Sequence, residues 1–133
     1  MPKILLTILI LIASFAAHAK EYGNYDPKRL LVVAETPSGK KYHFDGAYLD
    51  LILNDLASHA NNYPPRFDNP QDKERAIRDV KALSGMLDAL INGPSPNSGL
   101  MLRAAHLNSM GHNLDIPGAA EKAAAIFKKH DQT

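Results

Sequence analysis

The sequence predicts an all-α domain of about four to five helices, packed as helical hairpins. Apolar residues recur at helical spacing in several segments, and capping residues and prolines mark the ends of those segments. No convincing run of strands interrupts them, and the links between them are short, which favours helix packed on helix. One short β-hairpin near residues 30–44 remains open as an alternative to the first helix.

Residues 1–19 have the pattern of a secretory signal peptide. Lys3 gives a positive start, residues 4–16 are almost wholly apolar, and small residues at Ala17 and Ala19 fit the positions that signal peptidase reads. A membrane-spanning helix needs about 17–25 apolar residues, and this run is shorter. We therefore expect cleavage after Ala19 and a single helical domain over residues 20–133, located in the periplasm and free of the membrane after cleavage.

The composition argues against several kinds of partner. Without Lys3 the chain has 14 basic and 14 acidic residues, so it offers no basic field for nucleic acid or anionic lipid. The absence of cysteine excludes disulfides and thiol nucleophiles, and the absence of tryptophan excludes sugar sites built on stacked indoles. We expect no cofactor.

The first segment of the domain has conflicting signals. Asp26-Pro27 is a cap followed by a first-turn proline, and the apolar residues 30–34 follow it, which favours a helix. The β-branched pair Val32-Val33 favours a strand, with a turn at residues 37–39 and a partner strand at 41–44. We take the helix as the first interpretation and keep the hairpin as the alternative.

The next two helices have clearer limits. Asp45 begins one that ends near residues 61–62, before two prolines, and Asn69-Pro70 caps another that ends at residues 92–94. Gly85 inside the latter costs about 1 kcal/mol relative to alanine, so we expect a close helix contact there. Two further helices complete the chain: one opens at Ser95-Pro96 and closes at Gly111, and the last spans roughly residues 117–129.

Residues 100–127 resemble a tetratricopeptide-type helical hairpin. A small residue, Ala104, lies in the first helix, which ends at Gly111, and Ala123 is followed four positions later by Phe127, expected to face inward. The connection is longer than in that family, and no aromatic residue precedes the glycine. The resemblance implies a protein-binding scaffold. Because repeat stacks usually need about three units, the chain would be a minimal stack or a homodimer.

The familiar catalytic patterns are missing from the sequence. It contains neither a G-x-S-x-G nucleophile elbow nor a phosphate-binding glycine loop. Asp55 and His59 share a helix face, but zinc needs three or four ligands, so we interpret them as a solvated ion pair. Asp115 near His112 is interpreted as a helix cap. We therefore expect neither an enzyme nor a metal site.

Two loops are candidates for binding a protein partner. Residues 63–67 combine two aromatic rings, a stiff Pro-Pro and an arginine, and the side chains expected at the second loop, residues 111–118, are exposed. The alternatives are that the aromatic rings cover the core and that the second loop only connects helices. The expected partner-binding residues are Tyr63, Pro64, Pro65, Arg66, Phe67, Asn113 and Leu114.

As a small exported helical protein with a neutral surface and no catalytic set, the chain resembles the periplasmic immunity partners of type VI secretion amidase effectors. This resemblance of class implies a non-catalytic immunity or inhibitor protein, whose partner is a secreted cell-wall hydrolase. The alternative function is a small-ligand or metal-binding envelope protein, with an apolar pocket lined by His106, His112 or the pair Asp55 and His59. A hydrolase with an unrecognised site is the third hypothesis.

Overall fold

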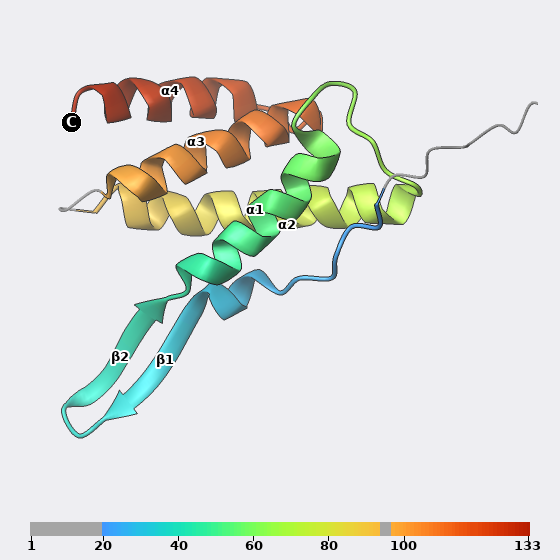
Figure 1. Cartoon of the computed structure of the whole chain (residues 1–133). Helices are drawn as coiled ribbons and strands as arrows, with labels where there is room; N and C mark the ends of the chain where they lie inside the picture. The colour runs from blue at the N-terminus through green and yellow to red at the C-terminus, as the bar shows by residue number, and fades with distance from the viewer. Residues whose placement is uncertain (1–19, 94–96) are drawn as a thin grey trace, which may run out of the picture.

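The computed structural model describes residues 20–93 and 97–133, and it confirms a mainly helical fold with one short β-hairpin (Figure 1). The expected leader, residues 1–19, lies outside the described residues, and so does Ser95-Pro96, the expected start of the third clear helix. In chain order the elements are a 3-10 turn η1 (Pro27–Leu30), β1 (Leu31–Thr36), β2 (Gly39–Phe44), α1 (Gly46–Ala60), α2 (Pro70–Ile91), α3 (Ser98–Asn113) and α4 (Ala119–Asp131). No helix of the described residues is long and apolar enough to cross a membrane.

Helix α3 lies at the centre of the packing. It contacts α4, α2 and α1, so the core forms around it, whereas the hairpin extends away from the helices (Figure 1). Burial of apolar side chains between the helices is the main force that holds them together. The fully buried side chains of the helices include Leu49, Ile52, Leu56, Val80, Leu83, Leu87, Met101, Leu107 and Met110.

The capping residues set the starts of α1 and α2 where the sequence places them. The Asp45 carboxylate accepts a hydrogen bond from the backbone N–H of Tyr48, and the Asn69 side chain accepts one from the backbone N–H of Asp72. These bonds satisfy N–H groups that the first turn of a helix leaves without a partner. The expected limits of both helices are therefore confirmed to within about two residues.

The helix expected over residues 26–34 is wrong, and the alternative hairpin is confirmed. Asp26 does cap a helical turn that begins with Pro27, but the turn ends at Leu30 and strand β1 follows directly. Residues 31–36 pair antiparallel with residues 39–44, and Gly39 adopts a φ of 117° beside the turn. The β-branched residues after the turn favour the extended backbone, and pairing with β2 supplies its hydrogen bonds.

The close helix contact expected at Gly85 occurs at Gly111 instead. A Cβ atom added at Gly111 would lie 3.2 Å from Cγ1 of Val80 and 3.3 Å from Cβ of Ala119, whereas one at Gly85 would meet nothing within 4 Å. Gly111 also does not close its helix, because α3 continues to Asn113. The glycine therefore lets α2, α3 and the start of α4 approach one another.

The two glycines predict different responses to alanine. Gly85→Ala should raise the free energy of unfolding by about 1 kcal/mol, because it is exposed inside a helix and alanine is the better helix former. Gly111→Ala has the same advantage in helix propensity, but its added methyl group must displace Val80 and Ala119. Its free energy of unfolding should therefore rise by less than that of Gly85→Ala, or fall. Urea denaturation of both variants measures the difference, and an equal gain in both would contradict the close approach at Gly111.

Candidate functional site

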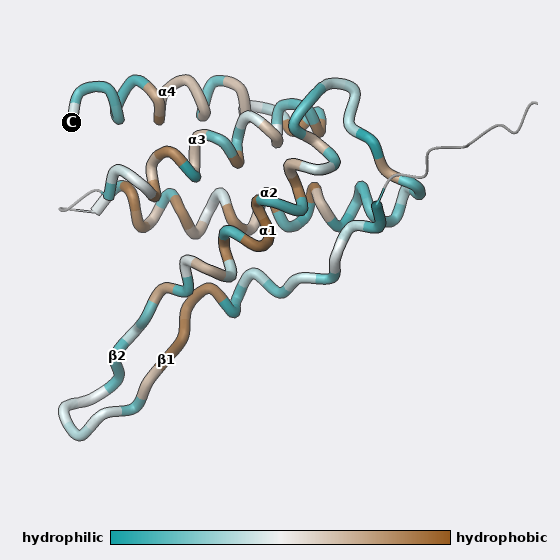
Figure 2. Tube along the Cα trace, in the orientation of Figure 1, coloured by the Kyte–Doolittle hydropathy of each residue, from teal (hydrophilic) through white to brown (hydrophobic). Residues whose placement is uncertain are grey.

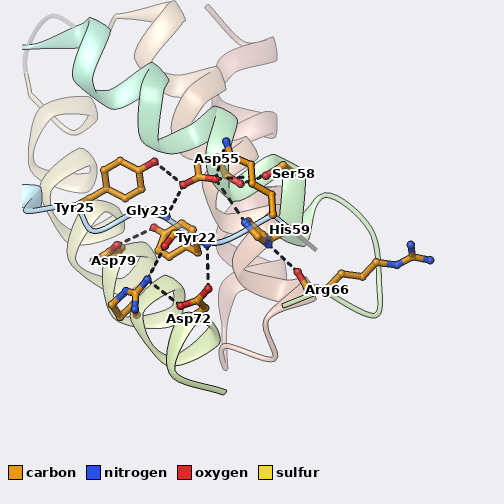
Figure 3. A network of polar contacts seen from close by, with 11 residues as sticks. Tyr22, Gly23, Tyr25, Asp55, Ser58, His59, Arg66, Asp72 and Asp79 are labelled. Carbon is orange, nitrogen blue, oxygen red and sulfur yellow. Dashed lines mark hydrogen bonds and ion pairs between the residues drawn. The ribbon is translucent and has the colours of Figure 1, made fainter. Parts of the chain in front are cut away.

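The loop that joins α1 to α2, residues 61–69, places an aromatic ring in solvent. The side chain of Tyr63 is 68% exposed, and that of Arg66 is exposed and points away from the protein (Figure 3). Phe67 is instead partly buried and packs against the core. Each interpretation of this loop therefore holds for one of its aromatic rings. Tyr63 projects into solvent, as a binding residue would, whereas Phe67 covers the core.

The base of this loop is fixed to the last turn of α1. The backbone N–H of Arg66 donates to the carbonyl oxygen of His59 at 2.8 Å, and Nδ1 of His59 lies 2.8 Å from the carbonyl oxygen of Arg66. A carbonyl can only accept, so Nδ1 carries the proton in this bond. The ring of Phe67 stacks on the His59 ring at 4.8 Å between centroids. These contacts hold the loop in one arrangement before any partner binds.

The solvated ion pair expected of Asp55 and His59 is wrong, because both residues are buried, at 5% and 4% exposure. The two atoms that such a pair would join, Oδ1 of Asp55 and Nε2 of His59, are 3.6 Å apart, too far for a good hydrogen bond. The rings of Tyr22 and Phe67 pack against His59 and separate it from solvent. The hydroxyl of Ser58 donates to the carbonyl oxygen of Asp55, not to the imidazole. In this arrangement His59 fixes the base of the loop over residues 61–69, through Arg66 and Phe67.

Asp55 binds the segment that precedes η1. Its carboxylate accepts hydrogen bonds from the backbone N–H of Gly23 at 2.8 Å and from the hydroxyl of Tyr25 at 2.5 Å (Figure 3). The ammonium group of Lys20 lies 3.6 Å from the same carboxylate. The buried charge of Asp55 is thus paired and hydrogen-bonded, which is the condition under which a carboxylate is tolerated in an interior.

Tyr22 is the most deeply placed residue of this segment, and α2 binds it through three charged side chains. Its backbone N–H donates to Asp72 at 3.1 Å, and its hydroxyl donates to Asp79 at 2.8 Å. Arg75 donates to its carbonyl oxygen at 2.6 Å and forms an ion pair with Asp72. This cluster was not predicted from the sequence. Its signal was Asp79, a charge on the apolar face of α2.

The two buried carboxyl groups differ in acidity. Burial opposes the charge of Asp55, but the hydrogen bonds from Tyr25 and Gly23 outweigh it, so the pKa of Asp55 is lowered. Burial dominates at Asp79 and raises its pKa, even though the Tyr22 hydroxyl donates to it. Burial and the neighbouring carboxylates also raise the pKa of both phenols, so Tyr22 and Tyr25 keep the protons that they donate.

The second loop does not expose the side chains expected to bind a partner. Leu114 is only 1% exposed, because it caps the C-terminus of α3 and enters the core, so the expectation of its exposure is wrong. Asn113 is partly buried, and its amide donates to the carbonyl oxygen of Ala60 at 2.8 Å. This contact ties the end of α3 to the end of α1.

His106 and His112 are exposed, and Nε2 of His106 lies 3.2 Å from the side-chain oxygen of Asn61. Within residues 20–93 and 97–133, no three histidine or acidic side chains are grouped so that they could hold a metal ion.

No protein-family model, curated protein or solved structure matches this chain. Within the stretch that resembles a tetratricopeptide hairpin, Ala104 and Ala123 are buried, but Phe127 is exposed and the expectation that it faces inward is wrong. The buried stripe of α4 is Ala119, Ala123 and Ile126, and Phe127 lies beside this stripe.

The raised pKa of Asp79 predicts how Asp79→Asn changes stability with pH. As pH rises from the ordinary value of 3.8 through the folded pKa, the wild type loses the stability that this carboxyl contributes when protonated. The variant cannot lose it, so its free energy of unfolding should rise relative to wild type as the pH increases over this range. Urea denaturation between about pH 3 and pH 7 measures the difference.

Asp55→Asn is the matched control, with the opposite sign. The lowered pKa of Asp55 contributes stability that is present above the ordinary pKa and lost as pH falls through the folded value. This variant should therefore become less stable relative to wild type as pH rises. If the stability of both variants relative to wild type changed in the same direction with pH, the opposite pKa shifts of Asp55 and Asp79 would be contradicted.

Proposed function

We propose that this chain is a periplasmic, non-catalytic protein-binding module, and specifically an immunity or inhibitor protein against an envelope-targeting toxin. The observation that carries the proposal is the exposed Tyr63 ring on a loop whose base is already fixed by His59. The leader pattern at residues 1–19 and the neutral composition support the location and the kind of partner.

The side chains of the loop suit a protein interface. Tyrosine and arginine are enriched among the residues that contribute most to binding, and both Tyr63 and Arg66 are free of the core. Pro64 and Pro65 restrict the backbone between them, so less conformational entropy is lost on binding. A projecting, stiff loop fits a concave surface, and the substrate cleft of an enzyme is such a surface.

The partner we propose is a secreted cell-wall hydrolase. Its cleft would receive the ring of Tyr63, and a carboxylate at the rim would pair with the guanidinium of Arg66, which offers donors in a fork that matches a carboxylate. Filling the cleft would exclude the substrate without any chemistry by the inhibitor. The commitment of Asp55 and His59 to internal contacts is consistent with such a role.

The test uses a secreted cell-wall hydrolase encoded beside this gene, purified and titrated with the chain. The wild type should inhibit it, and Tyr63→Ala or Arg66→Ala should each raise the dissociation constant about tenfold or more, a loss above about 1.4 kcal/mol. Tyr42→Ala is the matched control, because Tyr42 is 69% exposed but lies in the hairpin.

Circular dichroism and thermal unfolding would establish that all three variants fold as the wild type does. A wild-type chain that leaves the hydrolase fully active would remove the proposal. Equal losses for Tyr63→Ala and Tyr42→Ala would remove the assignment of the loop as the binding surface.

A further inference from the structure

The β-hairpin has two free edges. It stands clear of the helices, and nearly all its residues are exposed (Figure 1). Within the described residues each strand has only the other as a neighbour, so the outer edges of β1 and β2 present unpaired backbone N–H and C=O groups. Such edges pair readily with further strands unless charge or proline protects them.

Only one of these edges is protected. Strand β2 contains Lys40, Lys41 and His43, and edge lysines are a common means of preventing further pairing. Strand β1 is uncharged and free of proline over residues 31–34, and its acidic residue, Glu35, lies near the turn. Figure 2 shows the contrast as a hydrophobic β1 beside a hydrophilic β2.

We propose that β1 pairs antiparallel with β1 of a second copy of this chain, about a two-fold axis at Val33. Val33, which is 49% exposed, then faces Val33 of the second copy, and Val32 faces its Ala34. The two hairpins become one four-stranded sheet with β1 strands at its centre. Cross-strand pairs of β-branched residues are among those that stabilise antiparallel sheets.

Symmetry and charge favour this occupant over the other pairings of the hairpin. A two-fold axis normal to the sheet closes the assembly and makes each contact twice. Pairing of β2 with β2 would bring the lysines of both copies together. Pairing of β1 of one copy with β2 of the next would leave one β1 edge and one β2 edge unpaired. Further copies would then continue to add, and the assembly would not close. The β1–β1 dimer leaves only the lysine-bearing edges outside.

The inference goes beyond the proposed function, because it uses another surface. The hairpin precedes α1 and the Tyr63 loop follows it, so 15 residues of helix, on the order of 20 Å, separate the two (Figure 1). A dimer through β1 therefore leaves both Tyr63 loops free.

Because the chain has no cysteine, one engineered thiol can test the pairing. Val33→Cys places two thiols across the two-fold axis, within the Cα separation of about 4.4–6.8 Å that a disulfide needs. We expect mild oxidation of the purified chain to yield mostly covalent dimer. Lys41→Cys, on the outer edge of β2, is the control and should cross-link at least tenfold more slowly. Equal rates for both variants would overturn the proposal.

Mass in solution provides the second measurement. Sedimentation equilibrium of the wild type should give twice the mass of one chain, and Val33→Lys should give the mass of one chain, because it sets two ammonium groups against each other. Tyr42→Lys is the matched control: Tyr42 pairs with Val33 in the hairpin but lies on β2, so its dimer should persist. A wild type with the mass of one chain at every concentration, or an unchanged Val33→Lys dimer, would overturn the proposal.

Discussion

The burial of Tyr22 between α1 and α2 is the constraint on which this structure depends. Helix α1 packs mainly on α3, and Tyr22 connects it to α2: its ring lies edge-on to His59 of α1, while its hydroxyl and backbone bond to Asp79 and Asp72 of α2. Removing the Tyr22 side chain would leave the buried carboxyl group of Asp79 without its hydroxyl donor, which costs more than the hydrogen bond itself contributes. The segment before the first turn is therefore part of the core.

The candidate binding loop depends on this arrangement through one histidine. The rings of His59, Tyr22 and Phe67 pack on one another as a cluster, and His59 also bonds to the backbone of Arg66. The position of Tyr63 is thus set by contacts that lead back to the start of the domain. Stiffness at the loop comes from packing and hydrogen bonds beneath it, in addition to the prolines within it.

The features predicted correctly from the sequence are those that nearby residues determine, such as the starts of α1 and α2. Asp45 and Asn69 act through hydrogen bonds to residues three positions away, so their helices could be placed before the structure was known. The hairpin was ambiguous because a helix cap and a β-branched pair stand within a few residues of each other. The burial of Asp55 could not be predicted, since it depends on Gly23 and Tyr25, 32 and 30 positions earlier in the chain. The exposure expected of Leu114 was wrong because α3 continues past Gly111 to Asn113, which places Leu114 at the helix end and in the core.

The tyrosine contacts have a spectroscopic consequence. The chain contains five tyrosines and no tryptophan, so its intrinsic ultraviolet emission comes from phenols alone. Tyr22 and Tyr25 donate to carboxylates, which quench an excited phenol by accepting its proton, whereas Tyr42 and Tyr63 are in solvent. Release of the first segment from the helices would brighten this emission, so the molecule carries its own optical reporter for that event and needs no attached label.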